Sequence, residues 1–127
     1  MSRMETTVRI MEKMDSKMKV IAKSLLSSRT RWDLVRFFHA NPFTIHTANG
    51  LAKLVGRQPS QVKAEIEALL KQGVLRRLSQ DEDAASIYSY EPNSDVRLVV
   101  ELIDGACGGK IDLIDELLAE LKNENPA

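Results

Sequence analysis

Residues 51 to 77 read LAKLVGRQPSQVKAEIEALLKQGVLRR. This stretch contains a short amphipathic segment, a glycine, a longer amphipathic segment, a second glycine and a β-prone segment with two arginines. Glycine ends helices readily, and apolar residues three and four positions apart form one helical face. The order therefore predicts two helices joined by a tight turn, followed by a β-hairpin.

Local signals support both helices. Thr47 is a suitable N-cap for the first helix, in which Leu51, Leu54 and Val55 are spaced as one apolar stripe, and Gly56 ends it. Gln58 is expected at the N-cap of the second helix, with Pro59 at its first turn.

In the second helix, a core-facing stripe is predicted for Val62, Ile66, Leu69 and Leu70. The opposite, outward side carries small, polar and charged residues, which are Ser60, Gln61, Lys63, Ala64, Glu67 and Lys71. Gln61 stands three residues after Gln58, as in a weak capping box.

The segment resembles the winged helix-turn-helix of bacterial MarR-like and ArsR-like transcription regulators. The resemblance rests on five positions that occur without a gap, namely Leu51, Ala52, Gly56, Val62 and Gly73. It implies a mainly α fold with a small β-wing, and a DNA-binding regulator whose second helix enters the major groove.

Within that resemblance, Ser60, Gln61, Lys63 and Ala64 are the groove-facing positions. Gln61 has the chemistry to read adenine, and the expected phosphate contacts are Lys53, Arg57, Lys63, Arg76 and Arg77. The chain departs from the family at Arg57, usually apolar, and at Gln58, usually serine. Its predicted wing tip, Asp81-Glu82-Asp83, is acidic and would repel phosphate.

An alternative from another class is therefore a winged-helix module that binds a protein, such as an acidic partner, without specific DNA binding. No nucleophile and base pair, paired catalytic carboxylates or cofactor motif occurs, so we expect neither an enzyme nor a cofactor. His39, His46 and Cys107 are too scattered to predict a metal site. A redox role for Cys107 in its Gly-rich segment is a further alternative to a structural one.

The 127 residues have no apolar run long enough for a membrane span, and charges interrupt the N-terminal segment. With a single cysteine, these features predict a cytoplasmic protein. The net charge of zero hides an asymmetry: residues 1–80 carry 15 Lys/Arg and 6 Asp/Glu, whereas residues 81–127 carry 3 and 12. Either the basic part faces a polyanion, or the acidic part keeps the chain soluble or pairs with the basic part of the same or another chain.

Three regions are expected: a dimerisation helix at 1–28, the winged helix-turn-helix at 29–92, and C-terminal helices at 93–127. Residues 4–28 show the heptad pattern of a coiled coil, and this methionine-rich helix is expected to pack against a partner protomer or against another helix of its own chain. A frayed extension is the alternative. The C-terminal helices are apolar enough to form a dimer interface, and an intrachain antiparallel hairpin is the alternative. The expected homodimer contacts are Met4, Met11, Met14, Met18, Ile21, Leu25, Val99, Ile103, Ile114 and Leu118.

Around the central stretch, the pattern predicts a helix over 29–40 with Trp32, Val35 and Phe38 on its buried face. A short strand is expected at 43–45, two wing strands at 75–79 and 86–91, and helices at 95–104 and 110–122.

Overall fold

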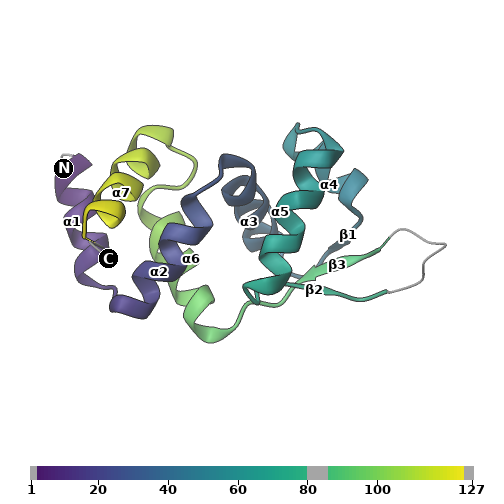
Figure 1. The fold of residues 1–127 in the computed structure, drawn as a ribbon, viewed down its shortest axis with the longest axis horizontal. Helices are drawn as coiled ribbons and strands as arrows, with labels where there is room; N and C mark the ends of the chain where they lie inside the picture. Colours follow the sequence, from purple (N-terminus) through teal and green to yellow (C-terminus); the bar gives the residue numbers. More distant parts are fainter. Residues whose placement is uncertain (1–2, 80–85, 125–127) are drawn as a thin grey trace.

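The computed structural model describes residues 3–79 and 86–124, which form seven helices and three short strands (Figure 1). In chain order these are α1 (Arg3–Glu12), α2 (Ser16–Leu26), α3 (Arg29–Ala40), β1 (Ile45–His46), α4 (Ala48–Val55), α5 (Pro59–Lys71), β2 (Leu75–Arg77), β3 (Tyr88–Tyr90), α6 (Ser94–Ala106) and α7 (Ile111–Glu124). The described residues are thus mainly helical with a small antiparallel sheet, and this part of the predicted fold class is confirmed. None of the described helices is long and apolar enough to cross a membrane.

The strands form one antiparallel sheet in the order β1-β3-β2. Ile45 pairs with Ser89, and Leu75 pairs with Tyr90. Tyr88 and Tyr90 both face inward, as their alternation predicted, and Tyr90 stacks on Phe38 of α3 with ring centroids 6.1 Å apart. The first strand begins two residues later than predicted, which leaves Phe43 outside the sheet and 98% exposed.

Side chains at the helix ends account for where α4 and α5 begin and stop. The Thr47 hydroxyl accepts a hydrogen bond from the Gly50 N–H at 3.1 Å, so Thr47 is the predicted N-cap of α4. Gly56 ends α4 with a φ of 70°, a left-handed conformation that glycine adopts without steric cost. The predicted stripe of α4 was wrong in one residue, because Leu54 is 56% exposed while Ala48, Leu51 and Ala52 are buried.

The predicted single heptad helix over residues 4–28 is wrong, because the chain breaks between α1 and α2. The Asp15 side chain accepts a hydrogen bond from the Met18 N–H at 2.8 Å and so starts a new helix. A continuous heptad seam needs one unbroken helix. The two shorter helices instead take different directions (Figure 1).

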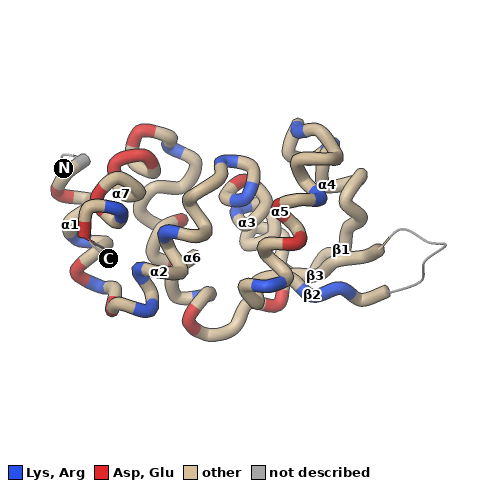
Figure 2. Tube along the Cα trace, viewed as in Figure 1, with Lys and Arg blue, Asp and Glu red and all other residues tan. Residues whose placement is uncertain are grey.

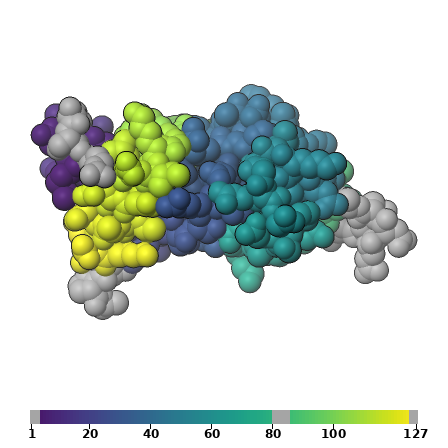
Figure 3. Space-filling model, turned by 90° about the horizontal axis from the view of Figure 1, so that it is seen from above, coloured from purple at the N-terminus to yellow at the C-terminus, as the bar shows by residue number. Residues whose placement is uncertain are grey.

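The terminal helices pack within the chain. Helix α7 lies against α1 and α2, and α6 lies against α2, α1 and α3. The two C-terminal helices therefore pack mainly on the N-terminal helices and not on each other, so the alternative of a simple antiparallel hairpin is wrong. Figure 3 shows α1 and α7 together at one end of an elongated molecule, with α4 and α5 at the other.

This packing corrects most of the predicted dimer contacts. The single-chain core includes Met11, Met14, Leu25, Val99, Ile103 and Ile114, and Met18, Ile21 and Leu118 pack partly against it. Met4 alone of the ten is exposed, at 47%. These apolar residues find their partners inside one chain, so they do not form a free dimer interface.

The charge asymmetry is largely an intrachain feature. Among the described residues, five ion pairs join the basic N-terminal part to the acidic C-terminal part: Lys17–Asp95 at 2.7 Å, Lys19–Glu124 at 2.7 Å, Arg29–Asp115 at 3.1 Å, Arg36–Asp104 at 3.1 Å and Arg76–Glu91 at 3.5 Å. Figure 2 shows acidic residues along α7 and basic residues along the neighbouring α2. The alternative in which the two parts pair within one chain is therefore confirmed for these residues.

Candidate nucleic-acid interface

Helix α5 presents a polar outer face, as its sequence predicted. Val62, Ile66 and Leu69 are at most 1% exposed and hold the helix on the core. The exposed residues of the opposite side are Ser60, Gln61, Lys63, Ala64, Glu67 and Lys71. The four expected groove-facing positions therefore share one solvent-exposed surface at the N-terminal half of the helix.

An ion pair between α3 and α5 holds this helix in place. Arg31 Nε donates to Glu65 Oε2 at 2.7 Å, and the two side chains are only 16% and 17% exposed. The Arg31 guanidinium also donates to the Ser24 carbonyl at 2.7 Å. Glu65 is thus neutralised on the core side of α5 and does not offset the charge of Lys63 on the outer side.

All three arginines expected to contact phosphate are already paired with carboxylates. Arg57 binds Asp33 at 2.9 Å, Arg76 binds Glu91 at 3.5 Å, and Arg77 binds Glu67 at 2.8 Å. Arg77 also lies over the Tyr88 ring, with 5.6 Å from its guanidinium carbon to the ring centroid. A phosphate would have to compete with a carboxylate for each of these arginines.

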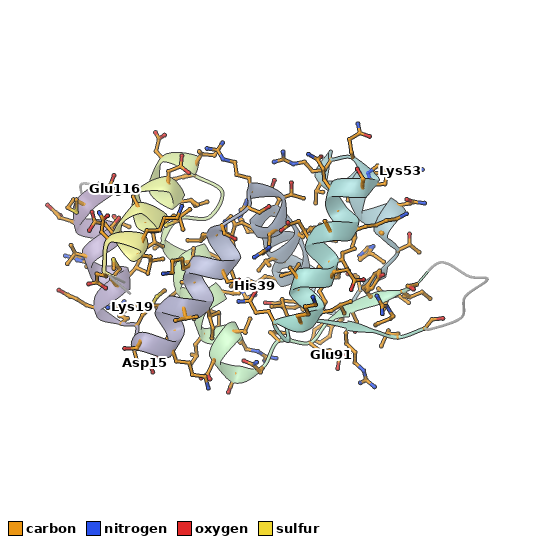
Figure 4. All side chains as sticks on the ribbon, in the orientation of Figure 1. Asp15, Lys19, His39, Lys53, Glu91 and Glu116 are labelled. Atoms are coloured by element: carbon orange, nitrogen blue, oxygen red, sulfur yellow. The ribbon has the colours of Figure 1, made fainter. Side chains whose placement is uncertain are left out.

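The lysines differ from the arginines. Lys53 on α4 and Lys63 on α5 are exposed, and neither forms an ion pair with any residue in the ranges 3–79 and 86–124. Lys53 extends into solvent at the end of the molecule that carries α4 and α5, far from Asp15 and Lys19 (Figure 4). Among the five residues expected to contact phosphate, these two ammonium groups are therefore the ones available to a polyanion without breaking an ion pair within the described residues.

Gln61 has a structural role in addition to its expected one. Its side-chain oxygen accepts a hydrogen bond from the Gln58 N–H at 3.2 Å, which is one half of the predicted capping box. A bidentate contact to adenine uses the same oxygen together with the amide nitrogen. Gln61 would therefore read a base with an oxygen that it shares with the start of its own helix.

A hollow of about 300 Å³ lies between the start of α4, the outer side of α5 and strand β3. Its lining consists of Thr47, Ala48, Asn49, Lys63, Glu67, Ser86 and Tyr88. Asn49 was not among the predicted contacts. Its position in the first turn after the Thr47 cap could have predicted that its side chain lies near the start of α5. Its side-chain amide adds a hydrogen-bonding group beside Lys63.

The remaining candidate residues do not form a second site. His39 Nδ1 lies 3.3 Å from the Tyr90 hydroxyl, and His46 Nε2 lies 2.8 Å from the Thr44 hydroxyl. Burial raises the pKa of Tyr90 to about 12, so its hydroxyl stays protonated at neutral pH. Among the described residues, no three His, Cys, Asp or Glu side chains come together as metal ligands.

Cys107 lies at the end of α6 and is 2% exposed, rather than in an open loop. Burial raises the pKa of its thiol, and the smaller effect of nearby Lys110 lowers it. A protonated, inaccessible thiol is a poor nucleophile. The geometry therefore favours the structural role of Cys107.

Comparisons of this chain with protein-family models, with curated proteins and with solved structures found no match. Function is therefore inferred from the geometry and charge of the surfaces themselves.

Proposed function

We propose that this protein is a winged-helix DNA-binding transcription regulator that acts as a homodimer, with α5 in the major groove and β2 and β3 as the wing. The observation that supports this most directly is the exposed stripe of Ser60, Gln61, Lys63 and Ala64 at the N-terminal half of α5. Short, hydrogen-bonding side chains at this end of a helix allow close approach to base edges.

The proposed affinity comes from few phosphate contacts. Lys53 and Lys63 supply two unpaired cations per chain, hence four per dimer. Since each neutralised phosphate adds about −0.9 to the slope of log K against log salt, the expected slope is about −4. Affinity would then fall about 100-fold between roughly 50 and 200 mM salt.

The test is fluorescence anisotropy of labelled duplex DNA from a randomised pool, titrated with the protein at several salt concentrations and followed by sequencing of the retained DNA. The K63E variant should bind more weakly on all sequences, and its slope should drop to about −2 because two contacts per dimer are lost. The matched control is K13E, which makes the same charge change at the exposed Lys13 beyond α1, at the opposite end of the molecule. If K63E binds DNA as tightly as the wild type, the placement of α5 in the major groove is contradicted.

A second candidate function is a winged-helix module that binds a protein and has no specific DNA site. The pairing of Arg57, Arg76 and Arg77 with carboxylates favours it, because these side chains are engaged without any nucleic acid. The two functions predict different effects of a substitution of Glu67 on DNA affinity.

For a DNA-binding protein, E67Q removes a carboxylate from the outer side of α5 and releases Arg77, so DNA affinity should rise about three- to tenfold. The same change at the exposed Glu12 on α1, E12Q, serves as the control. A module without a DNA role would show weak binding that neither variant alters and no enriched sequence.

A further inference from the structure

The outer face of the sheet is uncovered and carries exposed apolar residues beside polar ones. The inner face carries Tyr88 and Tyr90 against the core, whereas the outer face carries Ile45, 55% exposed, in register with Ser89 and Arg76, and Leu78, 47% exposed, lies just beyond β2. Phe43 stands beside this face and is 98% exposed. A phenyl side chain in water beside other apolar residues is typical of a surface that meets a partner.

The same face is hollowed. A cavity of about 590 Å³ lies over it, and its apolar lining comes from Pro42, Phe43, Ile45, Leu78 and Pro92, with Tyr90 beside them. The polar lining comes from His39, Thr44, Ser89, Glu91, Arg97 and Glu101. In Figure 4, the labelled side chains of His39 and Glu91 lie at the end of the sheet that is nearer the middle of the molecule. The exposed Phe43 therefore forms part of the wall of a hollow that is large enough to receive a second aromatic side chain.

The charges around the hollow are balanced. Arg97 and Glu101 stand one turn apart on α6, both exposed, and Glu91 at the rim is paired with Arg76. An acidic or basic partner would meet equal numbers of attractive and repulsive groups here. A second copy of the same face carries charges of both signs as well, so Arg97 of one copy can face Glu91 or Glu101 of the other.

We propose that two copies of this chain pair through the outer face of the sheet, each inserting Phe43 into the hollow of the other. This surface combines a knob, a hollow and complementary charges in one patch, which is what an isologous interface requires. Most apolar residues of the terminal helices, by contrast, are buried in the core of their own chain. The pairing does not depend on DNA binding and is measured without DNA.

The first experiment measures molar mass by light scattering and sedimentation for the full chain, for F43S and for V20S. Val20 on α2 is a matched control, since it is an apolar side chain, 60% exposed, at the other end of the molecule. We expect a dimer for the wild type and for V20S. For F43S, which loses two buried phenyl groups per dimer, the Kd should rise by at least about 100-fold.

The second experiment uses the charges. R97E leaves two acidic side chains on this turn of α6, and E101R leaves two basic ones, so each variant alone should repel its own copy and be monomeric. Mixing the two monomeric variants should restore a 1:1 dimer, because the two altered faces are now complementary. If R97E and E101R acted only by breaking an Arg97–Glu101 contact within their own helix, mixing the two variants would not restore a dimer. Circular dichroism verifies that each variant is folded.

Several results would overturn the proposal. These are a wild-type monomer at about 100 μM, a dimer that F43S leaves intact, or dissociation by V20S, which would place the interface on the terminal helices. Masses that grow beyond two chains with concentration would also exclude a closed two-fold pair.

Discussion

Gly56 shows how a single residue shapes the region around α5. It has a φ of 70°, and a Cβ built there would meet nothing within 4 Å. The constraint is therefore the backbone conformation and not the surrounding space. A residue with a side chain must adopt the left-handed region at this turn or change the angle between α4 and α5.

We accordingly expect G56A to lower the free energy of unfolding by about 1 to 2 kcal/mol. Gly105 provides the control, because it lies within α6 without a positive φ and also has open space at its Cβ position. G105A should be stabilising by about 0.5 to 1 kcal/mol, since alanine favours a helix over glycine. Urea unfolding followed by the fluorescence of Trp32, which is 2% exposed, measures both. Equal effects of the two changes would contradict the backbone explanation.

At the scale of elements, α1 and α2 are amphipathic as expected, but their partners are different from those that a heptad suggests. The apolar side of α1 contributes Ile10 and Met11 to the core, where α7 packs against the helix. A coiled coil and an intrachain helix pair bury similar stripes, so periodicity alone does not separate them.

The two arrangements predict different consequences for a substitution in α1. Ile10 is 4% exposed, so I10A should cost about 2 to 4 kcal/mol of unfolding free energy without altering molar mass in the folded state. V8A, at a position that is 45% exposed on the same helix, should change stability by less than about 0.5 kcal/mol. If α1 were a dimerisation arm, I10A would instead dissociate a dimer and leave the unfolding of each chain nearly unchanged. Urea unfolding and light scattering on the same samples separate these outcomes.

At the scale of the whole molecule, four of the five ion pairs between the basic and acidic parts, counted among the described residues, link opposite ends of the sequence. The side chains of these pairs are between 31% and 74% exposed. Exposed pairs of this kind contribute little to stability and are screened by salt. The apolar core, which runs from Ile10 to Leu121, supplies the main stabilisation.

Stability and DNA binding should therefore respond to salt in different ways. Between roughly 50 mM and 1 M NaCl, the urea midpoint should shift by less than about 1 M, because the lost ion pairs are weak. The proposed DNA binding should disappear over the same range. Loss of a cooperative unfolding transition in 1 M NaCl would show that charge pairing, and not the core, holds the two parts together.

The sequence by itself determined the features that depend on a few neighbouring residues. The bounds of α3 at Arg29–Ala40, the Thr47 cap, the turn at Gly56 and the outer face of α5 were all predicted correctly. Caps, glycine conformations and helical periodicity act over one or two turns, so their signals lie within a short stretch of chain. The break at Asp15 had such a signal, but the heptad spacing of the methionines outweighed it.

Only the tertiary structure decided which surfaces remain free. It buried Leu25 and Ile114 in one core, paired Arg57 and Arg77 with carboxylates, and left Lys53, Lys63 and Phe43 exposed. An apolar stripe or a charge binds whichever complementary group the fold brings near, and those groups are up to 105 residues apart in this chain, as for Lys19 and Glu124. Local pattern shows that a residue needs a partner, whereas the packing of distant elements determines what that partner is.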